Sequence, residues 1–191
     1  QRLSFVGELG WEIYVPINTS REIYLKLVEH GKKYDLVHAG GHALDIMRME
    51  KGYLHWGHDI SPAENPYEAG LEFTVKLNKQ IDFIGKEALE TKNRKKKKQL
   101  TNFVLDKSKP GAPLLLHDEP IYYNGKIVGE TTSSNYSFYY DKSMIFGYID
   151  SEIDLKNLNG GTFEVEVAKS KYTMSIQYEA LHDPNNNFTK I

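Results

Sequence analysis

The patterning of the chain changes at a basic run, and this change limits the folds that its 191 residues can adopt. Lysine dominates residues 92–99; before them apolar side chains recur at helical spacing, and after them short β-rich runs alternate with turns. We interpret the run as a solvated linker rather than a site for a polyglutamate tail or nucleic-acid phosphates. The sequence therefore predicts a mixed α+β domain over residues 1–95 and a β domain over residues 96–191.

Two segments of the first half alternate apolar and polar residues with a period of two. The alternation of residues 11–16 predicts a half-buried strand whose outer face carries Glu12 and Tyr14. The alternation of residues 71–77 is cleaner still and predicts a second strand.

Three stretches of the first half have helical character. Thr19 followed by Glu22 has the spacing of a capping box, which predicts an amphipathic helix that continues to Gly31. A second helical pattern follows a glycine pair and runs through Glu50. A short helix is expected over residues 86–91.

The second half is divided by turn signals and shows no helical spacing. The turn signals are Pro110-Gly111, Asn124-Gly125 and Gly160-Gly161. The predicted strands are residues 126–132, 144–149, 163–168 and 173–180. Several short strands without helices indicate a small barrel or a sandwich.

Composition excludes several classes of function. The net charge of −2 gives no global field for nucleic acid or a membrane surface, so we expect small molecules or other proteins as partners. The absence of cysteine excludes disulfides and thiolate chemistry. No apolar run approaches the ~20 residues that cross a bilayer, and we expect a cytoplasmic protein. Because the chain opens at Gln1 and not at methionine, we expect a piece of a longer protein.

Two charged side chains are candidates for ligand binding. Glu12, on a strand face, can accept two parallel hydrogen bonds from a flat amide-amine edge such as that of a pterin or a guanine, although a surface glutamate is the simpler interpretation. Arg48, within a helix, has three interpretations: a surface ion pair, a buried partner of Glu50 or Asp45, or a ligand anchor.

The loop after this helix contains His55, Trp56, His58 and Asp59. Two imidazoles and a carboxylate suggest a metal, but a glycine-containing loop fixes no separation between them, and we predict no metal site. Trp56 can stack on a planar ring or cover the core. No serine, histidine and acid form a nucleophile motif, so covalent catalysis has no support.

Several ordered motifs carry a family resemblance. They are residues 5–16, 48–53, 56–59, 66–71 and 82–89 in the first half, and residues 119–134 and 142–148 in the second. With these motifs the chain resembles the folate-binding aminomethyltransferase family, the T-protein of glycine cleavage, and most closely the C-terminal half of dimethylglycine and sarcosine dehydrogenases. The resemblance implies a ferredoxin-like α/β part of the folate-binding domain, followed by a small antiparallel β-barrel of Greek-key type.

The resemblance also implies roles for four residues. Glu12 would grip the pterin edge of tetrahydrofolate, Arg48 would lie at the folate site, and Trp56 and Phe5 would pack on a ring. No catalytic residue is expected in the chain, because the family's aspartate would lie before Gln1, in an N-terminal half of the same protein. FAD is implied only if a flavin domain precedes that half.

The chain departs from the family pattern at three positions. Leu44 replaces an arginine of the family helix, and Phe5 replaces a tyrosine and has no hydroxyl to donate. Asp183 stands where T-proteins have an arginine, which favours the dehydrogenase branch.

We therefore expect part of a tetrahydrofolate-dependent one-carbon transferase that acts on a methylated amine or an aminomethyl donor, located in the mitochondrial matrix if the source is eukaryotic. Two alternatives stay open. One is a folate-dependent demethylase of a sulfonium or ether substrate, and the other is a non-catalytic folate-binding or interaction module.

Overall fold

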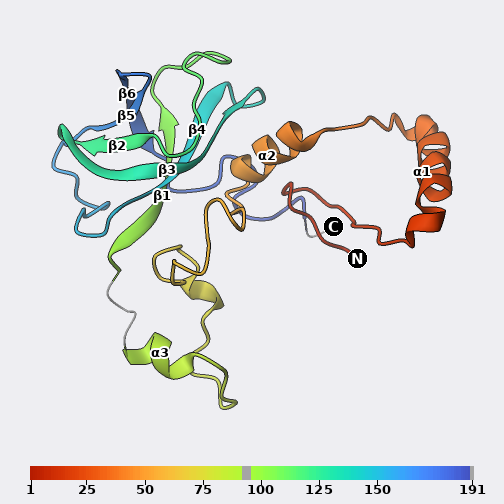
Figure 1. Ribbon diagram of the computed structural model, residues 1–191, viewed down its shortest axis with the longest axis horizontal. Helices are drawn as coiled ribbons and strands as arrows, with labels where there is room; N and C mark the ends of the chain where they lie inside the picture. The colour runs from red at the N-terminus through yellow and green to blue at the C-terminus, as the bar shows by residue number, and fades with distance from the viewer. Residues whose placement is uncertain (92–95, 190–191) are drawn as a thin grey trace.

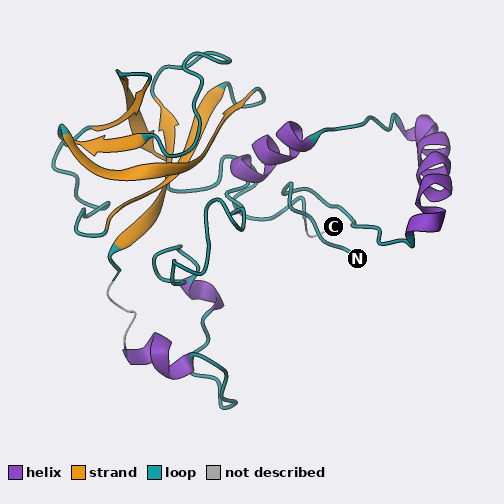
Figure 2. Cartoon of the chain, viewed as in Figure 1, coloured by secondary structure: helices purple, strands orange, loops and turns teal. Residues whose placement is uncertain are grey.

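The computed structural model describes residues 1–91 and 96–189, so residues 92–95 of the basic run, where the domain boundary was predicted, lie outside the described residues. Its strands all belong to one closed barrel in the second half of the chain, whereas the first half contains helices and loops (Figures 1 and 2). The α+β class and the small antiparallel barrel that were predicted are confirmed.

The barrel has the strand order β1-β4-β3-β2-β5-β6, and β6 closes on β1. All neighbouring strands are antiparallel. Strands β2, β3 and β4 follow one another as hairpins, and β1 lies beside β4 after a long connection, which is a Greek key. The strands are β1 (Lys98–Leu105), β2 (Pro120–Tyr123), β3 (Lys126–Ser137), β4 (Lys142–Asp150), β5 (Phe163–Val167) and β6 (Ser170–Ile176).

The barrel forms where the sequence places its turns and fills with β-branched and aromatic side chains. Asn124 and Gly125 both have positive φ, 51° and 78°, as the two-residue hairpin between β2 and β3 requires. The core contains Ile121, Ile145 and Val165, all 0% exposed. The strand predicted at 173–180 begins and ends earlier, because Ser170 already pairs with Val167 of β5.

The helices of the first half are α1 (Ile17–Gly31), η1 (Lys32–Tyr34), α2 (Gly41–Glu50), η2 (Glu72–Thr74) and α3 (Lys86–Thr91). The bounds of α2 and α3 confirm the predicted helices. The capping box at the start of α1 is wrong: the helix begins two residues before Thr19, whose hydroxyl donates to the carbonyl of Pro16 at 3.0 Å.

The two strands predicted in the first half are not formed. Residues 11–16 are extended loop, and residues 71–77 contain the short helix η2 and turns. A strand needs a neighbour for its backbone groups, and the described residues offer none to either segment beyond the pairing of Glu12 with Gln1 at 2.8 and 2.9 Å.

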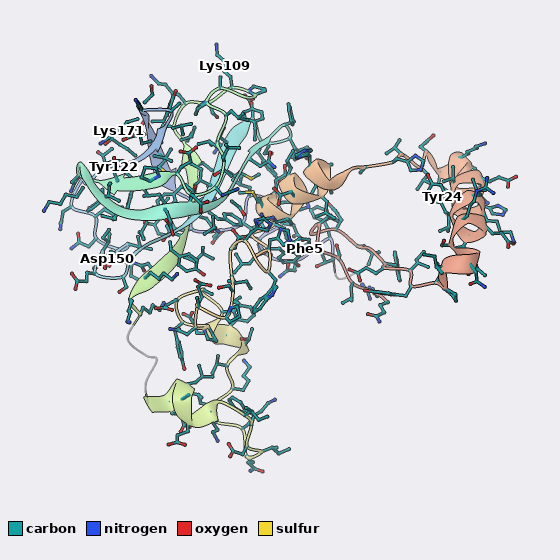
Figure 3. All side chains as sticks on the ribbon, viewed as in Figure 1. Phe5, Tyr24, Lys109, Tyr122, Asp150 and Lys171 are labelled. Atoms are coloured by element: carbon teal, nitrogen blue, oxygen red, sulfur yellow. The ribbon has the colours of Figure 1, made fainter. Side chains whose placement is uncertain are left out.

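The helices differ in how they contact the barrel. Helix α2 packs against β3, whereas α1 stands away from the barrel and has no buried residue (Figure 1). Figure 3 shows the side chain of Tyr24 on α1 far from the barrel residues Tyr122 and Lys171. Among the described helices, none combines the length and hydropathy that a membrane crossing requires.

Candidate functional site

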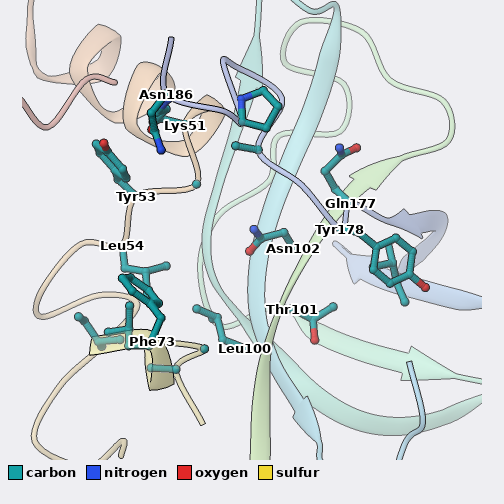
Figure 4. Close-up of a pocket in the computed structure, with 18 of the residues that line it drawn as sticks. Lys51, Tyr53, Leu54, Phe73, Leu100, Thr101, Asn102, Gln177, Tyr178 and Asn186 are labelled. Atoms are coloured by element: carbon teal, nitrogen blue, oxygen red, sulfur yellow. The ribbon is translucent and has the colours of Figure 1, made fainter. Parts of the chain in front are cut away.

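A cavity of about 700 Å³ lies between the loops of the first half and the barrel (Figure 4). One side comes from the loops that contain Phe5 and Tyr53 and from the short helix η2, which contains Phe73. The other side comes from β1 and the segment that follows β6. The cavity is therefore built by both halves of the chain, and their relative placement sets its width.

One wall of the cavity is aromatic. The rings of Phe5 and Tyr53 stack with their centroids 6.5 Å apart and an angle of 15° between their planes. His55 meets Phe5 edge-on at 5.9 Å. Phe73 contributes a side chain that is 68% exposed. Such a wall offers flat apolar faces to a planar ligand.

The opposite wall contains polar side chains among apolar ones. Asn102 lies on β1, and its backbone carbonyl accepts a hydrogen bond from the backbone N–H of Gln177 at 2.8 Å. The side-chain amide of Asn102 has no hydrogen-bond partner among the described residues and lies at the cavity (Figure 4). An amide presents both a donor and an acceptor, which is the pattern that the edge of a heterocycle needs.

A buried ion pair borders the cavity. The Lys51 ammonium lies 2.6 Å from the carbonyl oxygen of Asp183 and 3.1 Å from its Oδ2. Burial by itself would raise the pKa of Asp183, but hydrogen bonds from the backbone N–H groups of Asn187 and Phe188, together with Lys51, lower it. Asp183, which departs from the family pattern, is thus compensated by a lysine of α2's C-terminal turn.

Arg48 lies beneath the cavity wall and not in it, with 1% of its residue surface exposed. Its guanidinium donates to Asp45 at 2.7 Å, to Asp59 at 2.5 Å and to the hydroxyl of Ser133 at 2.7 Å. Thr132 donates to the second oxygen of Asp59 at 2.6 Å. The arginine therefore joins α2, the loop after it and strand β3.

The structure brings one of the four predicted ligand residues to the cavity. Phe5 lines it, whereas Glu12 and Trp56 are exposed outside it, Trp56 to 64%. Glu12 accepts a hydrogen bond from the hydroxyl of Tyr14. The folate roles of all four residues, Phe5 included, stay predictions. Asp59, which looked like a metal ligand, uses both oxygens on protein donors.

Sequence reasoning missed Tyr53, Asn102 and Gln177. Tyr53 belongs to a motif that carries the family resemblance, so that motif could have indicated it. Asn102 lies within a strand that the sequence did not predict, and it faces the cavity because its neighbour Phe103 faces the barrel core.

Comparison with protein families gives two matches. The N-terminal domain of the GCVT family matches residues 1–79, and the glycine cleavage T-protein C-terminal barrel domain matches residues 98–183. The chain belongs to the glycine cleavage T-protein family. Its closed barrel corresponds to the family's C-terminal barrel domain.

Several curated relatives are longer than this chain. Mitochondrial sarcosine dehydrogenase of Homo sapiens is 35% identical over 194 residues, which cover 99% of this chain and 21% of the relative. Mitochondrial dimethylglycine dehydrogenase of Mus musculus is 37% identical over 94% of this chain and 20% of its own length. The chain thus spans about a fifth of these dehydrogenases.

A solved structure supports the fold of both halves of this family member. The crystal structure of the glycine cleavage system aminomethyltransferase T from Bartonella henselae superposes with a TM-score of 0.80 at 23% identity. The match covers 96% of this chain and 49% of the other. The placement of the first half beside the barrel is therefore that of the aminomethyltransferase fold.

Proposed function

We propose that the chain is the C-terminal part of a tetrahydrofolate-dependent one-carbon transferase of the dimethylglycine or sarcosine dehydrogenase type, and that by itself it is inactive. The observation that carries the proposal is the cavity between the two halves, which joins the stacked rings of Phe5 and Tyr53 to the amide of Asn102. The family resemblance assigns Phe5 to the folate ring, and Phe5 is the predicted ligand residue that lines this cavity.

The lining fits a pterin. A flat bicyclic ring can lie against the Phe5 and Tyr53 wall, and Asn102 can donate to and accept from its polar edge. Tetrahydrofolate, when bound, supplies the nitrogen that accepts the one-carbon unit. The residues of this chain contribute position: a ring held in attack geometry removes several kcal/mol of entropic cost from the transfer. Glu12 belongs to the same N-terminal segment as Phe5 but lies outside the cavity, and it is proposed to orient the pterin edge in the complete site.

The missing parts of the site are proposed to come from the polypeptide that precedes Gln1. The solved aminomethyltransferase is about twice as long as the part that this chain matches. Apolar side chains of the first half are exposed, including Trp11 at 62%, Ile13 at 60% and Val37 at 81%. We propose that an N-terminal half covers this surface, pairs with residues 11–16 and 71–77 as strands, and contributes the aspartate of the family.

The donor is proposed to be a methylated amine. Sarcosine dehydrogenase, dimethylglycine dehydrogenase and the 4-methylaminobutanoate oxidase of Paenarthrobacter nicotinovorans, which is 36% identical, all carry such a compound in their names.

FAD would accompany a flavin domain upstream. Because both dehydrogenases are named mitochondrial, a matrix location is proposed for a eukaryotic source.

Calorimetric titration of tetrahydrofolate into the longer, native-length protein tests the proposal. We expect saturable binding that Phe5→Ala and Glu12→Ala each weaken about tenfold or more, because Phe5 is proposed to supply a ring contact and Glu12 to accept hydrogen bonds from the pterin edge. Glu29→Ala, on the exposed surface of α1, is the matched control and leaves binding unchanged. Unchanged affinity in both Phe5→Ala and Glu12→Ala contradicts this assignment of the site.

One relative favours a second function. The mitochondrial pyruvate dehydrogenase phosphatase regulatory subunit of Mus musculus is 34% identical over 89% of this chain, and its name describes regulation and not catalysis. A non-catalytic module is therefore the alternative proposal. Absence of tetrahydrofolate binding by the native-length protein would favour it.

A further inference from the structure

A second cavity, of about 410 Å³, lies between α2 and the tip of the hairpin that joins β3 to β4. It shares no lining residue with the cavity described above. The lining residues are Glu8, Ala43, Ile46, Met47, Glu50, Phe138, Tyr139 and His182.

Glu50 is a buried carboxylate without a cationic partner. The residue is 8% exposed, and its Oε1 accepts a hydrogen bond from the hydroxyl of Ser137 at 2.6 Å. Among the described residues, no lysine, arginine or histidine nitrogen forms an ion pair with Glu50. The two basic residues nearest to it in the sequence have other partners: Arg48 pairs with Asp45 and Asp59, and Lys51 pairs with Asp183. A buried charge of this kind is costly unless an opposite charge meets it.

The position of Glu50 in its helix increases the need for a cation. Glu50 is the last residue of α2, where the helix dipole places partial negative charge. A carboxylate there is unfavourable, and a positive group is favoured. The second oxygen, Oε2, has no hydrogen-bond donor among the residues that the structure describes, and the residue lines the cavity.

The rest of the lining selects an organic cation. Phe138 and Tyr139 are 72% and 81% exposed, although Phe138 packs edge-on against Tyr136 at 5.2 Å and Tyr139 against Tyr140 at 4.8 Å. Aromatic faces attract cations, and ammonium groups with methyl substituents fit best where the other walls are apolar. Ile46 and Met47 of α2 supply those walls.

The neighbouring charges also make the cavity electronegative. Glu8 lies at the cavity with its Oε1 2.7 Å from Nε2 of His182. Burial raises the pKa of Tyr140, and the charges of Tyr139, Glu50, Glu8 and Asp183 raise it further. Glu8 thus has an imidazole beside it, whereas the Glu50 carboxylate has no basic side chain paired with it among the described residues.

We propose that this cavity binds a small organic cation, namely a methylated ammonium group, between Glu50 and the rings of Phe138 and Tyr139. The site does not depend on folate, because no residue of the first cavity contributes to it.

Titration of tetramethylammonium chloride into the longer, native-length protein without folate, against sodium chloride at equal ionic strength, tests the proposal. The readouts are the melting temperature and the ¹³C-methyl NMR signal of Met47, with buried Met174 of the barrel core as internal reference. We expect tetramethylammonium to raise the melting temperature above the sodium chloride value and to shift the Met47 signal saturably.

Glu50→Gln keeps the shape of the side chain and removes its charge, so we expect binding to weaken about tenfold or more. The double variant Phe138→Ala with Tyr139→Ala alters only exposed side chains, and we expect it to lose tetramethylammonium binding. It tests the proposal even if Glu50→Gln fails to fold. Tyr34→Ala, an exposed tyrosine of η1, is the control and retains binding.

Equal effects of tetramethylammonium and sodium chloride, or binding that persists in the double aromatic variant, would overturn the proposal. Since folate is absent throughout, neither result bears on the tetrahydrofolate titration, and the two proposals fail separately.

Discussion

The barrel and the first half of the chain contain similar numbers of apolar residues but differ in how far they bury them. In the barrel every strand has a neighbour on both sides, and Ile121, Ile145 and Val165 are fully buried. In the first half α1 buries none of its residues, and Ile17 on that helix is 92% exposed. The difference teaches that the barrel closes its own core, whereas the first half is held mainly through α2 and the polar contacts around Arg48.

The largest expected effect tests those polar contacts. Arg48→Met leaves the buried carboxylate of Asp59 without its cation, so we expect a loss of about 3–5 kcal/mol in the free energy of unfolding. Urea unfolding measures it. Lys26→Met removes an exposed ion pair on α1 with Glu22 and is expected to cost about 0–1 kcal/mol. Equal losses in the two variants would contradict the buried role of Arg48.

The next effect compares the two sets of apolar side chains. Ile145→Ala opens a cavity in the closed barrel and is expected to cost about 2–5 kcal/mol of stability. Leu25→Ala on α1 removes a side chain that is 48% exposed and is expected to change stability by less than about 0.5 kcal/mol. Chemical denaturation of both variants checks the contrast. A comparable cost at Leu25 would show that α1 is packed in solution.

A smaller effect concerns the loop that carries Phe5. Gly7 has a φ of 76°, and a Cβ there would lie 2.6 Å from Cγ of Lys51. Gly7→Ala therefore combines backbone strain with crowding, and we expect a cost of about 1–3 kcal/mol. Gly57→Ala, at a φ of 89° with open space around it, separates the strain from the crowding. If thermal unfolding shows the same loss of stability for Gly7→Ala and Gly57→Ala, the Lys51 side chain moves aside at no measurable cost, and crowding contributes nothing.

The smallest effect is a pH dependence at the junction of the two halves. The lowered pKa of Asp183 means that its contribution to stability is complete above the unfolded-state pKa of 3.8 and disappears as pH falls through the lower folded-state value. Asp183→Asn should flatten the acid limb of the stability curve relative to the wild-type chain. Circular dichroism follows the unfolding at each pH. If the stability of Asp183→Asn falls at low pH as steeply as that of the wild-type chain, Asp183 does not contribute to the pH dependence.

Local patterns predicted the elements whose neighbours lie close in the sequence. Helices α2 and α3, the hairpin at Asn124-Gly125 and the predicted strands of the barrel all formed. Residues 11–16 and 71–77 have an equally clear alternation and formed no strand, because the described residues supply no neighbouring strand to either segment. Alternation therefore predicts a preference for strand, and pairing realises it.

The candidate site shows the same division. The motif around Phe5 indicated a ring contact, and the structure places Phe5 at the cavity. The spacing offered Asp45 as a partner of Arg48, and the two side chains pair, but neither Asn102 nor the contacts of Arg48 with Asp59 and Ser133 could be inferred from it. By itself the sequence determined the family, the barrel and the short-range turns, because these depend on local preferences and ordered motifs. Only the tertiary structure decided that Arg48 meets Ser133, 85 residues away, and that Lys51 meets Asp183, 132 residues away. Contacts at such separations form when whole elements pack, and no period in a sequence encodes them.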